Sequence, residues 1–378
     1  MEHGTMRVGT LPVRARFSYF NVGEGAGEYH VVFTPAGGPT DADRQLALLD
    51  EATRLFPSIV KEGRPTPVWR RFFLGDPVNR YPFPGGEWPA AETFIGQYLP
   101  GGERAVAWGY YVDGATVSRD GNATIMHRSL EHHYYTGLHA GPRGDEEAQT
   151  RTLFRALHDE TRSRGIHFAG EIARLWVHVN DIDNRYAGMV TARRKFFEDI
   201  GLTPDTHYIA STGIEGKSPF PGALVCVDAY AVKGLLPGQL SYLRASDFLS
   251  RADRYGVTFE RGTVIAHGDR ARLLISGTAS IDKHGELLFP LQVVAQARRA
   301  MQNIDALLRE GGAAFTDLTH AIVYLRDAAD YPLVRNVISS SWPLVPTIYA
   351  VAPVCRPGWL VEIECSAIVA RDAAFPPF

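Results

Sequence analysis

The sequence predicts an α+β fold made of two tandem modules, each a mixed β-sheet with helices packed on one face. A helix-length segment with Ala-Gln near its start occurs twice, as EEAQTRTLFRALHDETRSRG from Glu146 and VVAQARRAMQNIDALLREGG from Val293. Each copy continues into a β-rich run, RLWVHVNDID from Arg174 and HAIVYLRDAAD from His320, and then into a second helix and a closing strand. This order, present twice, indicates an internal duplication.

The repeat also divides the chain. Residues 1–235 are expected to hold the first module, together with extra strands such as PVWRRFF from Pro67 and AVAWGYYVDG from Ala105. Residues 236–378 are expected to form the second module, with the boundary near residues 233–238. At 378 residues the chain exceeds the usual size of a single hydrophobic core, which agrees with more than one domain.

The two closing strands, ALVCVDAYAV from Ala223 and WLVEIECSAIV from Trp359, differ in their charge. Their alignment places Cys226 opposite Glu362 and Asp228 opposite Glu364. Alternation along the strand puts both glutamates on one face. Burying a carboxylate is costly without a partner, so we expect this face to meet another module or subunit and to line a pocket there. The alternative for Glu362 is a solvated or salt-bridged carboxylate on an edge strand. Glu364 is expected to bind substrate, to orient a neighbour or to pair with a basic residue.

Composition narrows the class of partner. A formal charge of −3 without a basic run argues against nucleic acid. The N-terminus MEHGTMRVG lacks the features of a signal peptide, and no apolar run approaches the ~20 residues of a membrane span. Three cysteines are too few for a disulfide framework. We therefore expect a soluble cytoplasmic protein with a small-molecule ligand or a protein partner.

Two polar segments are candidate parts of a site. MHRSLEHHYYTGLH carries enough donors for a metal, but neighbouring histidines on a strand point to opposite faces, so no metal is predicted. His133, or its neighbour His132, is instead expected to line an aromatic pocket. The loop THYIASTGIEG offers His207 and Glu215 as substrate-binding residues, with an ordinary turn as the alternative.

Several segments together resemble the Rid (YjgF) superfamily over roughly residues 255–369: LLISGTASID from Leu273, the helix AQARRAMQNIDALL, the run IVYLRDAADYPLVRN and the strand LVEIECSAIV. The resemblance implies trimers with ligand clefts between subunits, so a homo-oligomer, with a trimer favoured, is expected. In the imine-hydrolysing branch an arginine stands fifteen residues before the family's glutamate. Counting back from Glu362 gives Thr347, which disfavours imine deamination.

Most of the chain resembles the two-domain branch that includes the chorismatases. The branch's acid/base glutamate with an upstream Cys-Arg is matched by Glu362 and Cys355, and its arginine on the last helix is matched by Arg335. A tyrosine-glycine segment ending in Phe-x-Arg is partly matched by RYGVTFERG, which implies that Tyr255 and Arg261 bind substrate. The Pro-Arg-Gln of this branch is replaced by PGQ, and these departures argue against chorismate itself.

The chain further resembles the cyclases that close carbazole rings in alkaloid and antibiotic biosynthesis. The resemblance implies deprotonation-initiated, oxidative cyclisation of an aromatic precursor, with Glu362 as base and Arg335 and Arg261 stabilising negative charge. Cys355 is expected to shape the pocket or relay a proton, or else to be only a small buried residue. No flavin, nicotinamide or metal motif is visible, so no cofactor is expected and molecular oxygen is the expected oxidant. The alternatives are a chorismatase that forms a hydroxybenzoate or dihydroxycyclohexadiene carboxylate, and a non-catalytic Rid-like binding protein.

Overall fold

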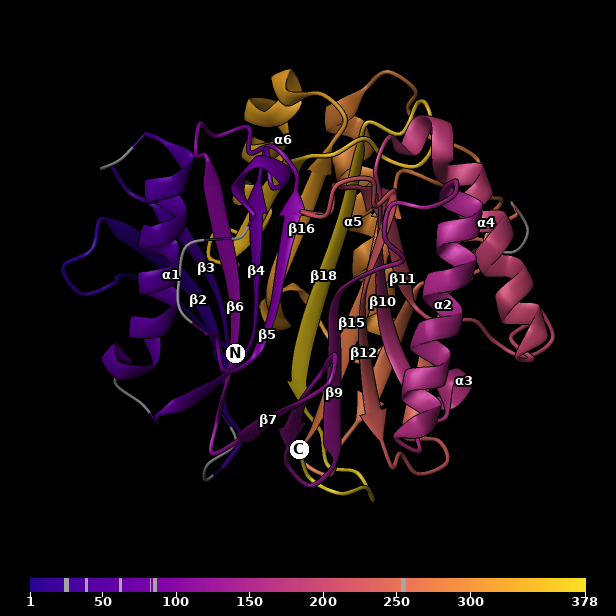
Figure 1. Cartoon of the computed structure of the whole chain (residues 1–378), viewed down its shortest axis with the longest axis horizontal. Helices are drawn as coiled ribbons and strands as arrows, with labels where there is room; N and C mark the ends of the chain where they lie inside the picture. Colours follow the sequence, from indigo (N-terminus) through magenta and orange to yellow (C-terminus); the bar gives the residue numbers. More distant parts are fainter. Residues whose placement is uncertain (24–26, 38–39, 61–62, 82, 84–86, 253–255) are drawn as a thin grey trace.

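Three six-stranded mixed sheets form the interior of the protein, and helices cover their outer faces (Figure 1). The computed structural model describes residues 1–378 except 24–26, 38–39, 61–62, 82, 84–86 and 253–255. None of the helices in this described part of the chain is long and apolar enough to span a membrane.

The three sheets share one strand order. The first contains, in spatial order, β1 (Glu2–Arg7), β2 (Val13–Phe20), β3 (Glu28–Pro35), β6 (Ala105–Asp113), β4 (Pro65–Leu74) and β5 (Ala91–Gly96). The second contains β7 (Thr116–Asp120), β8 (Ala123–His127), β9 (Glu131–His139), β12 (Val225–Lys233), β10 (Ile172–Val179) and β11 (Ser211–Glu215). The third contains β13 (Leu240–Leu243), β14 (Gly262–Ala266), β15 (Arg270–Ala279), β18 (Val361–Ala370), β16 (Leu318–Leu325) and β17 (Thr347–Val351).

In each sheet the final pair of strands is parallel and the other pairs are antiparallel. The prediction of an α+β fold with Rid-like repeats is confirmed. The strands expected as additions to the first module, β4 and β6, belong to a complete sheet of their own, so residues 1–235 contain two sheets. The proposed boundary at residues 233–238 begins at the last residue of β12 and continues into the connection to β13. Association of whole chains into a homo-oligomer stays a prediction.

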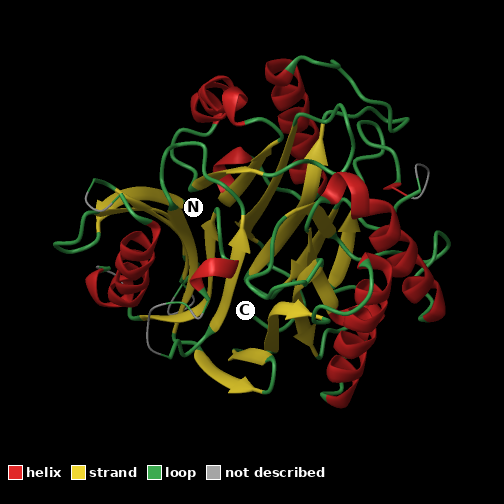
Figure 2. Ribbon diagram, turned by 45° about the horizontal axis from the view of Figure 1, so that its top comes forward, coloured by secondary structure: helices red, strands yellow, loops and turns green. Residues whose placement is uncertain are grey.

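Helices cover the outer face of each sheet (Figure 2). They are α1 (Ala42–Ile59) on the first sheet, α2 (Glu146–Ser163), α3 (Phe168–Glu171) and α4 (Ile182–Asp199) on the second, and α5 (Val293–Glu310) and α6 (Tyr331–Ser341) on the third. Short 3-10 turns occupy η1 (Val78–Arg80), η3 (Phe315–Asp317) and η4 (Ala328–Asp330). The two repeat segments become α2 and α5. In α5 the residues at helical spacing, such as Ala297, Ile304 and Leu308, are buried because they form the stripe that meets the sheet.

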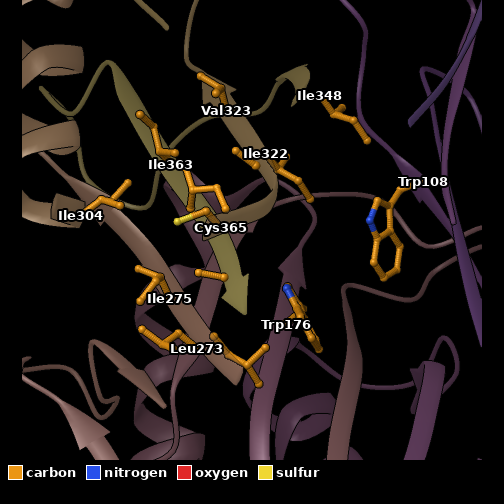
Figure 3. Packing of buried hydrophobic residues seen from close by; sticks show 14 of the residues in the cluster. Trp108, Trp176, Leu273, Ile275, Ile304, Ile322, Val323, Ile348, Ile363 and Cys365 are labelled. Carbon is orange, nitrogen blue, oxygen red and sulfur yellow. The ribbon is translucent and has the colours of Figure 1, made fainter. Parts of the chain in front are cut away.

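The inner faces of the three sheets share one core. Trp69 of the first sheet packs edge-on against Trp108 and Trp176, with ring centroids 5.3 and 5.1 Å apart. Figure 3 shows Trp108, Trp176 and Ile322, one from each sheet, around this interior. The three sheets therefore enclose a common centre and meet at three interfaces.

A buried ion pair crosses each of these interfaces. Arg71 and Asp228 join the first sheet to the second at 2.7 Å. Arg174 and Glu364 join the second to the third at 2.9 Å, and Glu28 and Arg270 join the first to the third at 2.7 Å. The face of β18 that carries the glutamates thus meets another module, as alternation predicted.

Candidate functional site

The three closing strands carry different residues at the position of Glu362. Glu362 pairs with Tyr324, the penultimate residue of β16. The same register position is Cys226 in the second sheet, opposite His178, and Val106 in the first, opposite Phe73. The sequence alignment of Cys226 with Glu362 therefore agrees with the strand pairing. Of the three equivalent positions, one carries a carboxylate.

Glu362 lies in a cavity at the interface between the second and third sheets. Helix α4 and strand β11 form one wall, contributing Tyr186, Arg193 and Ser211. The other wall comes from β15, β18 and the segments before β14 and β18. The cleft that the family resemblance predicts between subunits is thus formed within one chain. Its volume is about 20 Å³, which holds a single water molecule, so the lining must rearrange to admit an aromatic ring.

Burial of the Glu362 side chain is the main cause of its raised pKa. Its side chain is 3% exposed, and burial raises its pKa to about 8, with the negative charge of Glu364 acting in the same direction. The positive charges of Arg174 and Arg261 oppose this rise in part. A carboxyl group whose pKa lies near neutrality both donates and accepts protons under physiological conditions, which is the property of a general acid or base.

Glu364, on the same face of β18, has a full set of partners. Arg174 Nη2 donates to it at 2.9 Å, and Trp176 Nε1 and the Tyr324 hydroxyl each donate at 3.1 Å. The Thr212 hydroxyl also donates to this carboxylate. Glu364 lies outside the lining of the Glu362 cavity. Of the roles predicted for Glu364, the geometry therefore favours pairing with a basic residue over substrate binding.

Cys355 and Tyr186 stand beside Glu362 in the cavity lining and interact through a side-chain hydrogen bond. Burial, followed by the charge of Glu362, raises the pKa of the Cys355 thiol to about 12. The sulfur is therefore a neutral thiol at physiological pH, which disfavours a nucleophilic role. The pair is suited to passing a proton or to shaping the cavity.

Three arginines line the same cavity: Arg193, Arg261 and Arg356. Arg261 donates through Nε and Nη2 to the Ser250 carbonyl, at 3.2 and 2.8 Å. Arg193, which is 2% exposed, donates through Nε to Thr258 Oγ1 at 3.2 Å and through Nη1 to Ser211 Oγ at 3.4 Å. Fixed guanidinium groups of this kind stabilise negative charge on a bound oxygen.

Ser211 is the residue of the second sheet that is equivalent to Thr347 of the third sheet. It stands fifteen residues before Cys226, as Thr347 stands fifteen before Glu362. Ser211 lines the Glu362 cavity, whose opposite wall belongs to the second sheet, whereas Thr347 lines a cavity between the third and first sheets. Arg193, from a helix, supplies a guanidinium next to this serine.

Arg335 lies apart from Glu362, which corrects the expectation that the two share a site. It lines another cavity, between the third and first sheets. The reason is that α6 leads into β17, the edge strand that approaches the first sheet, where Val351 N donates to the Tyr98 carbonyl at 2.7 Å. Tyr255 falls outside the described residues.

The other predicted binding residues also lie outside the lining of the Glu362 cavity. His207 stacks on Tyr242 with ring centroids 4.5 Å apart. Glu215 accepts from the backbone N of Asp181 and Ile182, at 3.0 and 2.6 Å, and so caps the start of α4. These contacts are structural and correct the expectation of a shared substrate site.

His133 and its neighbour His132 point to opposite sides of β9. His133 Nε2 lies 3.2 Å from a Glu131 oxygen, and burial lowers its pKa. His132 Nδ1 lies 2.7 Å from the Tyr230 hydroxyl. Across the described residues, no three His, Cys, Asp or Glu side chains gather in a way that suits a metal ion.

The missing side chain of Gly277 makes room for the Glu362 carboxylate. A Cβ at this position would overlap Glu362 Oε1. We expect Gly277→Ala to displace the carboxylate and, where Glu362 exchanges a proton with the substrate, to lower kcat at least tenfold, since small displacements of a reacting group are costly. Steady-state kinetics checks this. Gly213→Ala, whose Cβ would meet Tyr186 at an ordinary 3.4 Å in the same cavity, is the matched control, and equal losses in both variants would contradict the expectation.

Comparisons with known proteins agree with this architecture. A family model described as endoribonuclease L-PSP matches residues 263–369. A 3-aminoacrylate deaminase from Acinetobacter baylyi is 30% identical over 97 residues, which are 25% of this chain and 77% of the relative. A 2-iminobutanoate/2-iminopropanoate deaminase from Capra hircus is 35% identical over 100 residues, 25% of this chain and 72% of the relative. A chorismatase crystal structure matches with a TM-score of 0.65 and 18% identity, covering 91% of this chain and 99% of the other, so the two share a fold.

Proposed function

Because this chain belongs to the Rid (YjgF) family and shares the fold of a chorismatase over most of its length, we propose that it is a cofactor-independent enzyme in which Glu362 transfers a proton on a small aromatic substrate. The observation that carries the proposal is the buried carboxyl group of Glu362, with its pKa raised to about 8, at a cavity between two sheets. Perturbed carboxyl groups in clefts are typical of acid–base catalysts.

The reaction that this arrangement supports best is ring closure of an activated aromatic precursor, as in carbazole formation. Ionised Glu362 removes a proton from the nucleophilic atom of the precursor. That atom then bonds to a carbonyl or quinone carbon, whose oxygen takes the negative charge beside Arg193 or Arg261. Protonated Glu362 returns the proton to this oxygen. Any later aromatisation that removes two electrons uses molecular oxygen, which is reduced to hydrogen peroxide.

Chorismate conversion is the second candidate. The observation in its favour is that three arginines, Arg193, Arg261 and Arg356, line one cavity with a carboxyl group able to donate a proton. Two such cations suit a substrate with two carboxylates. Imine deamination, the activity named for the relatives, has weaker support because neither Thr347 nor the equivalent Ser211 is an arginine.

Product analysis distinguishes these reactions. The purified protein is incubated separately with an amino-substituted ortho-quinone precursor, with chorismate and with 2-iminobutanoate, and products are separated by chromatography. We expect consumption of the quinone precursor with formation of a fused ring. Pyruvate release from chorismate would reverse the ranking of the two reactions, and ammonia released faster than in a protein-free control would contradict both. Binding in calorimetry without consumption would favour a carrier.

The pH dependence of kcat/KM reports the role of Glu362. A base acts in its ionised form, and the pKa of Glu362 is about 8, so kcat/KM is expected to rise about tenfold per pH unit below 8 and to level off above it. Initial rates between pH 5 and pH 10, at substrate concentrations below KM, measure this profile. A rate that falls as pH rises through 8 would show that the protonated form is active, which would favour the chorismate reaction.

A further inference from the structure

A second cavity lies between the third and first sheets. Its volume is about 150 Å³, and it is lined by Arg14 and Arg16 from β2, Tyr331 and Arg335 from α6, and Tyr349 from β17. A cavity of about this volume in another protein accommodates a benzene ring. The space therefore suits one six-membered ring without rearrangement, in contrast to the smaller cavity at Glu362.

The charge of this second cavity is strongly positive. Arg14, Arg16 and Arg335 line it, and Glu103 is the one carboxylate among the described lining residues. Within the described chain, none of the three guanidinium groups takes part in an ion pair. Three cations beside one carboxylate leave an excess of positive charge, which attracts an anionic ligand, and a guanidinium group binds a carboxylate through two parallel hydrogen bonds.

The walls provide flat apolar surface next to these charges. The rings of Tyr331 and Tyr349 meet edge to face, with centroids 5.2 Å apart and planes at 70°. Val32 and Ile348 also line the cavity. Aromatic and aliphatic walls beside a few convergent polar groups are the usual composition of a small-molecule site.

This cavity is the counterpart of the Glu362 cavity at another sheet interface. Both take a tyrosine and an arginine from the helix that follows the fourth strand of a sheet, Tyr186 and Arg193 in one and Tyr331 and Arg335 in the other. In the first sheet, the residue equivalent to Glu362 is Val106. Val106 lines the second cavity, and its side chain cannot act as an acid or a base. The second cavity thus keeps the cationic and aromatic groups and lacks the carboxyl group.

We propose that the cavity between the third and first sheets binds a single-ring aromatic carboxylate without converting it. The carboxylate pairs with Arg16 and Arg335, and the ring lies against Tyr331 and Tyr349. This proposal is independent of the reaction at Glu362, because the two sites share no lining residue.

The probe for this site is 4-bromobenzoate. Calorimetry with the full chain measures its Kd, and crystals soaked with it locate the bromine by anomalous scattering. We expect binding in the wild type, with the bromine between α6 and β2. The double variant Arg16→Gln/Arg335→Gln is expected to raise Kd at least tenfold, since it removes the guanidinium–carboxylate pairs.

Two controls make the result specific. Arg298→Gln removes an exposed arginine from α5, away from both cavities, and is expected to leave Kd unchanged. Arg193→Gln removes a guanidinium group from the Glu362 cavity and is expected to leave binding at the second cavity unchanged. Circular dichroism verifies that each variant is folded. Absence of binding at millimolar probe, equal Kd in the double variant, or bromine density confined to the Glu362 cavity would each overturn the proposal.

Discussion

Glu362→Gln is expected to lower kcat by about 10²- to 10⁴-fold while the protein remains folded. Glutamine keeps the shape of the side chain and removes the group that exchanges the proton. The loss should be large because burial has raised the pKa of this carboxyl group to about 8 and no other carboxylate lines the cavity in the described chain. Steady-state and single-turnover kinetics with the accepted substrate measure the change.

Cys226→Ser is the position-matched control for this variant. Cys226 occupies the same register position in the second sheet and lies outside the Glu362 cavity. Its replacement is expected to leave kcat within about twofold, a change too small to reflect loss of a general base. A folded Glu362→Gln protein with wild-type kcat would show that the carboxyl group is structural.

Arg174→Met is expected to lower the free energy of unfolding by about 3–5 kcal/mol. Arg174 and Glu364 are both almost fully buried, and the substitution leaves the carboxylate of Glu364 without its cation. The double variant Arg174→Met/Glu364→Gln should lose less than Arg174→Met alone, because it removes the unpaired charge as well. Urea unfolding followed by circular dichroism and by tryptophan fluorescence measures these differences.

An exposed ion pair serves as the comparison. Lys195 and Asp199 lie one turn apart on α4, 3.4 Å from each other and largely in solvent. Lys195→Met is expected to change stability by less than about 1 kcal/mol, since exposed pairs contribute little. If Arg174→Met cost no more than Lys195→Met, the pair across the second and third sheets would not stabilise their interface.

The sequence determined the features that depend on local pattern. The repeated helices from Glu146 and Val293 and the two matched closing strands indicated a duplicated α+β module, because helical and strand periodicities are visible in one stretch of chain. Alternation along β18 placed Glu362 and Glu364 on one face, and the cost of burying charge predicted an interface there. The resemblance added Cys355 and Arg261 beside Glu362, and the structure lines one cavity with all three.

The first sheet could not be identified as a third copy from its sequence. Its closing strand, AVAWGYYVDG, carries Val106 and Trp108 where the other copies carry Cys226 or Glu362 and Asp228 or Glu364. Because these side chains differ, the first sheet resembles the other two only in the order and direction of its strands. The strand order is set by hydrogen bonds between segments that are far apart in the chain. The periodicity of one segment does not show which other segment it pairs with.

The tertiary structure alone decided which residues share a site. Arg335 is close to Glu362 in sequence, yet α6 and β17 carry it to the interface with the first sheet. Arg193 and Tyr186 are far away in sequence, yet packing of the second sheet against the third brings them to Glu362. Local pattern specifies which face of a strand is buried, whereas the partner of that face depends on how whole sheets pack, and this packing is a property of the assembled core.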